Sequence, residues 1–210
     1  MRFLALAAAS LFFVGCAETA PRAPSVSLVP AEALSAVLPD SLGTFENAGE
    51  ETHRGYFADG SGGGGALGLV TVTRVYQSGG ALLSVSASSM DDAARYRAIV
   101  VSSGGHVMSD SLVAEHPALG AAVDAGWEAY SVAFGWLLVR PAGRALEVKS
   151  MFPDVLAEAL GSVDLSRLAG LDAAPVTVDD SFVRAPLAPQ PTRAPDESTG
   201  ATSEPSGVVG

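Results

Sequence analysis

The sequence contains one cysteine, Cys16, and this limits how the chain can reach a stable fold. A chain with a single thiol cannot form an intramolecular disulfide, so a folded domain must be stabilised by its hydrophobic core. Before Cys16 stand a single arginine, Arg2, and a mainly apolar run from Phe3 to Val14. That run is far too short to span a bilayer. A short basic start, an apolar run and small residues at its end are typical of an export signal.

The segment Val14-Gly15-Cys16 resembles the lipobox of bacterial lipoproteins, although Phe13 stands where that motif usually has leucine. The resemblance covers only the signal region. It implies that residues 1–15 are removed as a signal peptide. It also implies that Cys16 is lipidated, with diacylglycerol on its sulfur and an acyl chain such as palmitate on its amino group.

Ala17, the residue after the cysteine, bears on the location. Enteric bacteria place Asp there to retain a lipoprotein in the inner membrane, so by analogy Ala17 implies an outer-membrane protein facing the periplasm. The alternative is an ordinary secretory signal that is cleaved at a small-residue site such as Ala17 to Ala20.

The net charge of the chain excludes one class of partner. The formal charge is −11 at pH 7, Lys149 is the only lysine, and the arginines are scattered. Nucleic acid binding needs a basic stripe, and attraction to anionic lipid headgroups needs a polybasic segment. We therefore expect no nucleic acid partner, and we attribute membrane attachment to the acyl chains on Cys16.

Composition divides the chain into four regions: a signal peptide (1–15), a lipidated tether (16–26), a single globular domain (27–174) and a disordered tail (175–210). The tether has no apolar periodicity, and its roughly ten residues reach about 30 Å at most. The tail is rich in Pro, Ser and Thr and cannot bury enough apolar surface to offset its loss of entropy. Segments 176–178 and 181–183 can still add an edge strand before order ends.

Alternation of apolar and polar residues predicts strands in the first half of the domain. Apolar residues alternate with Thr or Ser over 70–73 and 83–88, and Gln77-Ser78-Gly79-Gly80 between these segments is typical of a hairpin turn. A helix is expected to start after Ser89-Met90-Asp91-Asp92 and to stop at Gly104. A short helix is predicted over 30–38, and residues 43–57 are interpreted as two short strands or an irregular edge.

The second half repeats this plan. Strands are predicted over 127–134, 136–140 and 145–150, followed by a helix that opens at Met151-Phe152-Pro153-Asp154 and a last helix capped by Asp164. Strand runs separated by helices predict an α+β fold with an antiparallel sheet and helices packed on one face. The two halves are similar enough to suggest a duplication, although coincidence explains the short match equally well.

No metal or phosphate site is predicted. The histidines are His53, His106 and His116, and their spacing does not match a known ligand pattern. His106 and His116 could gather around an ion with Asp110 and Glu115, but a polar surface loop is the better interpretation of that segment. The glycine run 60–65 is not followed by Lys and Ser or Thr, so we interpret it as a flexible loop rather than a phosphate-binding loop.

No catalytic or cofactor-binding residue is predicted either. A Gly-x-Ser-x-Gly nucleophile motif is missing from the sequence. Arg140 and Arg144 flank a predicted hairpin tip and could bind a carboxylate or phosphate, although solvated turn arginines are the commoner case. The densest aromatic cluster is expected to divide between core and surface; it contains Trp127, Tyr130, Phe134 and Trp136.

These observations predict a lipid-anchored, non-catalytic envelope protein that acts as an interaction or envelope-maintenance module. The alternative is a periplasm-facing carrier of a lipid or another apolar ligand, which would lie between the sheet and its helices. Expected contacts are the membrane, through acylated Cys16, and an envelope protein or an apolar ligand.

Overall fold

The structure is a computed structural model in which residues 23–58 and 66–186 are described. The expected signal peptide, Cys16, the glycine run at 60–65 and the last part of the expected tail lie outside these residues. None of the helices in the two described ranges combines the length and apolarity that crossing a membrane requires.

A nine-stranded sheet forms the centre of the fold. In spatial order its strands are β11 (Val183–Pro186), β3 (Phe45–Ala58), β4 (Ala66–Ser78), β5 (Ala81–Met90), β9 (Arg144–Ser150), β8 (Gly135–Arg140), β7 (Glu128–Val132) and β6 (His106–Val107), with β2 (Ser41–Leu42) beside β3. Among the described pairs in this sheet only β11 runs parallel to its neighbour. The expected α+β fold with an antiparallel sheet is confirmed.

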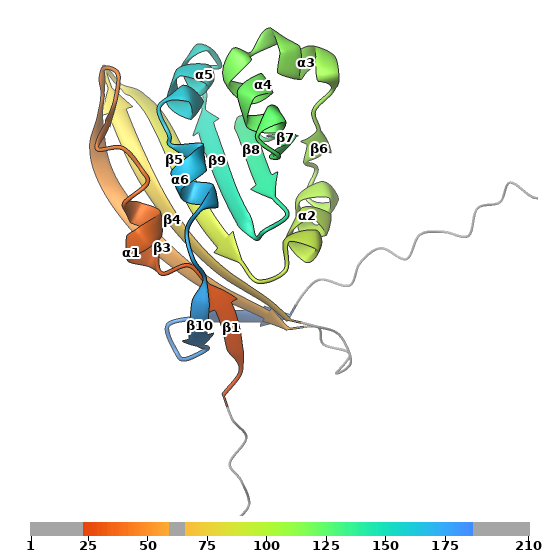
Figure 1. Cartoon of the computed structure of the whole chain (residues 1–210). Coiled ribbons are helices and arrows are strands. Elements are labelled where there is room, and N and C mark those ends of the chain that lie inside the picture. The colour runs from red at the N-terminus through yellow and green to blue at the C-terminus, as the bar shows by residue number, and fades with distance from the viewer. Residues whose placement is uncertain (1–22, 59–65, 187–210) are drawn as a thin grey trace, which may run out of the picture.

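The helices are α1 (Ala31–Ser35), α2 (Ala93–Ser102), α3 (Asp110–Glu115), α4 (Pro117–Asp124), α5 (Asp154–Gly161) and α6 (Leu165–Ala169). Apart from α2, the described helices pack on one face of the sheet, called the first face below, and enclose the larger hydrophobic core. In Figure 1, α1, α5 and α6 lie in front of the strands. Helix α2 packs against the opposite, second face, over a smaller core that contains Met90, Tyr130 and Val139.

The two halves are alike in their strands. Each contains an antiparallel meander, β3–β4–β5 and β7–β8–β9, and the last strands of the two meanders, β5 and β9, pair at the centre of the sheet. A helix follows each meander, but α2 and α5 lie on opposite faces. The similarity between the halves therefore extends to strand order and not to helix packing.

The β4–β5 hairpin follows the sequence pattern. Val72 and Val85 face the first-face core, and the intervening threonines and serines face the second face. Gly79 and Gly80 adopt φ of 54° and 87°, which a two-residue turn requires and glycine tolerates best. The predicted helix starts are confirmed as well: Asp92 caps α2 and Asp164 caps α6 through their side chains.

Two segments differ from expectation. Residues 43–57 do not form two short strands, because Phe45–Ala58 is one strand with an irregularity between Asn47 and Gly49 that shifts the apolar alternation. The segment interpreted as a polar loop after His106 folds into β6, α3 and α4. The helices are too short for a clear apolar period, yet Leu119 and Ala122 are buried in the core.

Both domain boundaries also need correction. The tether was expected to extend to residue 26, but β1 (Ser25–Leu28) pairs antiparallel with β10 (Ala174–Thr177) in a second, two-stranded sheet. The disordered tail was expected from residue 175, with an edge strand over 176–178 and 181–183 left open. Instead β10 and β11 belong to the fold, β11 lies at the edge of the large sheet, and Val178 and Phe182 are buried. The fold therefore includes these strands and the segment between them.

Candidate functional site

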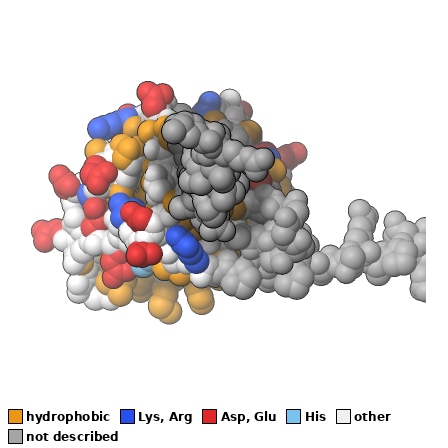
Figure 2. Space-filling model, turned by 90° about the horizontal axis from the view of Figure 1, so that it is seen from below, with side chains coloured by type: hydrophobic (Ala, Val, Ile, Leu, Met, Phe, Trp, Pro, Cys, Tyr) orange, Lys and Arg blue, Asp and Glu red, His pale blue; other side chains and the backbone are white. Residues whose placement is uncertain are grey.

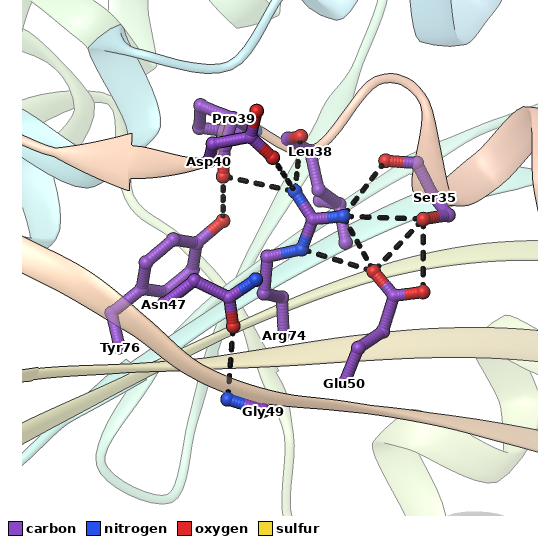
Figure 3. Close-up of polar contacts among 9 residues, drawn as sticks. All are labelled: Ser35, Leu38, Pro39, Asp40, Asn47, Gly49, Glu50, Arg74 and Tyr76. Carbon is purple, nitrogen blue, oxygen red and sulfur yellow. Dashed lines mark hydrogen bonds and ion pairs between the residues drawn. The ribbon is translucent and has the colours of Figure 1, made fainter.

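One buried polar cluster surrounds Arg74 on β4 (Figure 3). Arg74 is only 7 % exposed, and its Nη2 lies 2.6 Å from Oε2 of Glu50 on the neighbouring strand β3. Its Nη1 donates to the carbonyl oxygens of Leu38 at 2.6 Å and Pro39 at 3.1 Å. The Tyr76 hydroxyl donates to the same Pro39 carbonyl at 2.6 Å. The guanidinium therefore fastens the connection between α1 and β2 to the sheet.

The titration behaviour of this cluster follows from these contacts. Burial raises the pKa of Glu50, but hydrogen bonds from Ser35 and Arg74 outweigh burial and hold the pKa below its ordinary value. Burial also raises the pKa of Tyr76 to about 12. Glu50 is thus an anion and Tyr76 a neutral donor near neutral pH. This arrangement ties the connection between α1 and β2 to the sheet, and the Glu50 side chain stays 32 % exposed.

Arg144, one of the two candidate anion-binding residues, is buried in the structure. It is 6 % exposed, and Nη1 donates to the carbonyl of Gly143 at 3.0 Å, while Nη2 donates to the carbonyl of Leu171 at 2.5 Å. Burial lowers its pKa. The Ser89 hydroxyl, 3.4 Å from Nη1, accepts a hydrogen bond from the Val29 amide. Arg144 therefore links the β8–β9 turn to the segment after α6, while its buried Nε has no hydrogen-bond partner among the described residues.

Arg140 does not share a site with Arg144. Its guanidinium lies 5.8 Å from the centre of the Trp127 ring, within the range of a cation–π contact, and Nη1 donates to the Ala125 carbonyl at 3.4 Å. The two arginines pair across the hairpin in register, but their head groups bind different partners. This geometry does not support the possibility that the two arginines bind one carboxylate or phosphate together.

The histidines are not brought together. His53 lies on β3, 3.3 Å from Glu51, and His106 lies on β6, the strand at the opposite edge of the sheet. The His116 ring lies 4.7 Å from the Trp136 ring at an angle of 51°. Within the two described ranges, no group of three or more potential ligands is arranged to hold a metal ion.

The aromatic cluster divides between core and surface, as the sequence predicts. Trp127 and Trp136 are buried in the first-face core, while Tyr130 is buried on the second face beside α2. There Tyr130 donates to Glu128 at 2.9 Å, and Glu128 forms an ion pair with Arg97 of α2. Phe134 is 72 % exposed.

Phe134 belongs to an exposed apolar group at the end of the sheet where β9 leads into α5. We call this group the apolar tip; its members and their exposed fractions are Leu82 (57 %), Phe134 (72 %), Met151 (80 %) and Phe152 (52 %). Ser150 connects the three segments that carry these residues. Its amide donates to the Phe134 carbonyl at 2.9 Å, its hydroxyl donates to the Leu82 carbonyl at 3.3 Å, and the same hydroxyl accepts from the Phe152 amide at 3.0 Å.

The backbone at Phe134 is unusual. Its φ of 62° makes it the only described non-glycine residue with positive φ. A bulky residue pays a conformational penalty in this region, and such strain often marks a functional position. The next residue, Gly135, has no room for a side chain, because a Cβ there would lie 2.0 Å from the Val148 carbonyl oxygen. The turn thus places an exposed aromatic residue on a strained backbone.

No family model, curated protein or solved structure matches this chain.

The apolar tip lies opposite the end at which the N-terminal strand joins the fold. Val26 of β1 packs against Gly68 near the start of β4, whereas the tip lies beyond the β4–β5 turn (Figure 1). Figure 2 views the molecule from the β1 end, where acidic and basic side chains are interspersed. The tip segments 79–82, 132–135 and 150–153 contain no charged residue.

Sequence reasoning missed the apolar tip. Met151 and Phe152 were interpreted as the start of a helix, and Phe134 as part of a strand. Each of the three segments carries a bulky apolar residue within two positions of a Gly or Pro that favours a turn. That signal was present, because chain reversals at sheet ends are normally exposed and polar.

Proposed function

We propose that this protein is a lipid-anchored, non-catalytic envelope module that presents the apolar tip away from the membrane as an interaction surface. The observation that carries the proposal is the position of the tip, opposite the end where the chain enters the fold. An exposed apolar cluster of this kind is typical of a surface that binds something.

The length of the tether supports this orientation. From Gly68, which contacts Val26, to Ser78 at the far end of β4 the strand spans roughly 33 Å at 3.3 Å per residue. The chain between Cys16 and β1 reaches about 30 Å only when fully extended. A domain turned over to bring its tip to the leaflet would need the tether almost fully extended, which costs chain entropy, so the orientation with the tip away from the membrane is favoured.

Two measurements test the proposal. Cys16→Ala is expected to move the protein from the membrane pellet to the soluble fraction. In the lipidated chain, dyes on Ser25→Cys and Ala133→Cys, both exposed positions at opposite ends, would report the distance to an acceptor at the membrane surface. We expect stronger energy transfer from position 25. Pelleting of Cys16→Ala like the wild type, or equal transfer from both dyes, would contradict the proposal.

The carrier function is a second candidate because of Trp127. Its indole N–H is buried between the sheet and the helices and has no acceptor among the described residues. A ligand oxygen could accept this hydrogen bond. Native mass spectrometry of residues 17–210, purified without detergent from a bacterial periplasm, distinguishes the two functions. A copurifying lipid mass would favour the carrier, and a clean apo mass the interaction module.

A further inference from the structure

We propose that the apolar tip binds the apolar tip of a second copy of this chain, related by a twofold axis. This inference rests on the proposed function, because it names the partner of the surface presented there.

Charge favours a second copy at this end of the molecule. The chain carries a formal charge of −11, which opposes association of two copies through most of its surface. The three tip segments carry no charge, and the nearest residues in sequence that do are Lys149 and Asp154. Lys149 is paired with Glu147 at 2.8 Å. Two acidic copies can therefore approach through their tips without placing acidic side chains from these segments opposite one another.

The area of the tip fits a weak symmetric contact. From the exposed fractions of its members, 52 % to 80 %, the tip offers roughly 500 Å² of apolar side-chain surface per copy. A contact between two copies would bury about 1,000 Å² in total, at the lower end of specific interfaces. Weak association in solution follows, with stronger association where lipid anchors raise the local concentration of copies.

The tip is also rigid for an exposed loop cluster. Ser150 joins its three segments through hydrogen bonds to the backbone of Leu82, Phe134 and Phe152. The tight turn at Phe134, with its positive φ, fixes the backbone that carries the exposed ring. A surface that is already ordered loses little entropy on binding, so a small apolar area can contribute measurable affinity.

Sedimentation velocity of residues 17–210 over about 5–500 µM tests the inference, because an interface of this small area is expected to be weak and to need high concentrations. We expect the wild type to show a dimer that grows with concentration. Phe134→Asp should weaken dimerisation at least tenfold. Asp tolerates the left-handed backbone better than Phe, so this variant is expected to remain folded, and its thermal melt checks that.

Val107→Asp is the matched control. Val107 on β6 is 69 % exposed, close to the value for Phe134, but it lies outside the tip. This variant should dimerise like the wild type. A wild type that stays monomeric over the whole range, or equal weakening by the two substitutions, overturns the inference.

Flotation with lipid vesicles tests whether the apolar tip binds lipid instead of a second copy. If the wild type stays monomeric and floats with neutral phosphatidylcholine vesicles while Phe134→Asp does not, the tip binds lipid and the inference is overturned. The inference and the proposed function can fail independently of one another. Sedimentation uses the chain without its lipid, whereas the proposed function depends on the fractionation of Cys16→Ala and on dye distances in the lipidated chain.

Discussion

Nη2 of Arg74 lies 2.6 Å from Oε2 of Glu50, and the same carboxylate accepts hydrogen bonds from Ser35. Removing the Glu50 charge leaves the nearly buried guanidinium with only the fully exposed Asp40 carboxylate, 3.3 Å from Nη1, as a counter-ion. Glu50→Gln is expected to lower the free energy of unfolding by about 1–3 kcal/mol in urea titrations. Glu51→Gln on the same strand is the control, because the Glu51 side chain is 77 % exposed. Equal losses in the two variants would contradict the structural role of Arg74.

The same pair predicts how stability depends on acid. The folded pKa of Glu50 is lower than its ordinary value of 4.5. Its stabilising contribution is therefore complete above pH 4.5 and is lost as the pH falls through the folded pKa. The stability difference between wild type and Glu50→Gln should shrink when unfolding is measured from about pH 6 down to about pH 3. A stability difference that stays constant over that range would show that Glu50 stabilises the fold by something other than its charge.

The parts of the fold that the sequence predicts are those whose signals are local. The β4–β5 hairpin has an alternating pattern and two glycines at its turn, and Asp92 and Asp164 stand just before their helices. Strand β3 was divided in two because an irregularity interrupts its alternation. Helices α3 and α4 are too short to show an apolar period.

The surroundings of the candidate site residues could not be predicted, because they depend on contacts between distant segments. Arg144 is buried because Leu171, 27 residues later in the sequence, returns to accept its hydrogen bond. The apolar tip forms because Ser150 brings Leu82 and Phe134 together. The sequence shows that these residues are apolar, but not that they stay exposed side by side.

Gly135 provides a test of the turn that carries Phe134. A Cβ at position 135 would meet the backbone oxygen of Val148, which cannot move without breaking the β8–β9 pairing. Gly135→Ala is expected to destabilise the domain by about 1–3 kcal/mol in thermal or urea unfolding. Gly161→Ala at the end of α5 is the matched control, since no atom lies within 4 Å of its added Cβ. It should be neutral or stabilising by up to about 1 kcal/mol.

Phe134→Asn should separate stability from association. Asn adopts positive φ more readily than Phe, and the largely exposed ring contributes few contacts, so we expect a gain of about 0.5–1 kcal/mol in unfolding free energy. Dimerisation should weaken in the same variant, because the substitution removes the exposed Phe134 ring from the proposed contact. Phe152→Asn, at a position without positive φ, should bring no such gain. Loss of stability in Phe134→Asn would mean that its ring supports the fold.

Two truncations test the corrected boundary of the domain. Deleting 187–210 is expected to leave the melting temperature within a few degrees of the wild type, because that Pro-, Ser- and Thr-rich segment has little apolar surface to bury. Deleting 175–210 removes most of β10, all of β11 and the buried side chains of Val178 and Phe182. Losing such side chains costs several kcal/mol, which corresponds to a fall on the order of 10 °C. Calorimetry of both truncations measures these melting temperatures. If the longer deletion melted like the wild type, β10 and β11 would contribute no stability, and the domain would end at the boundary that composition predicts.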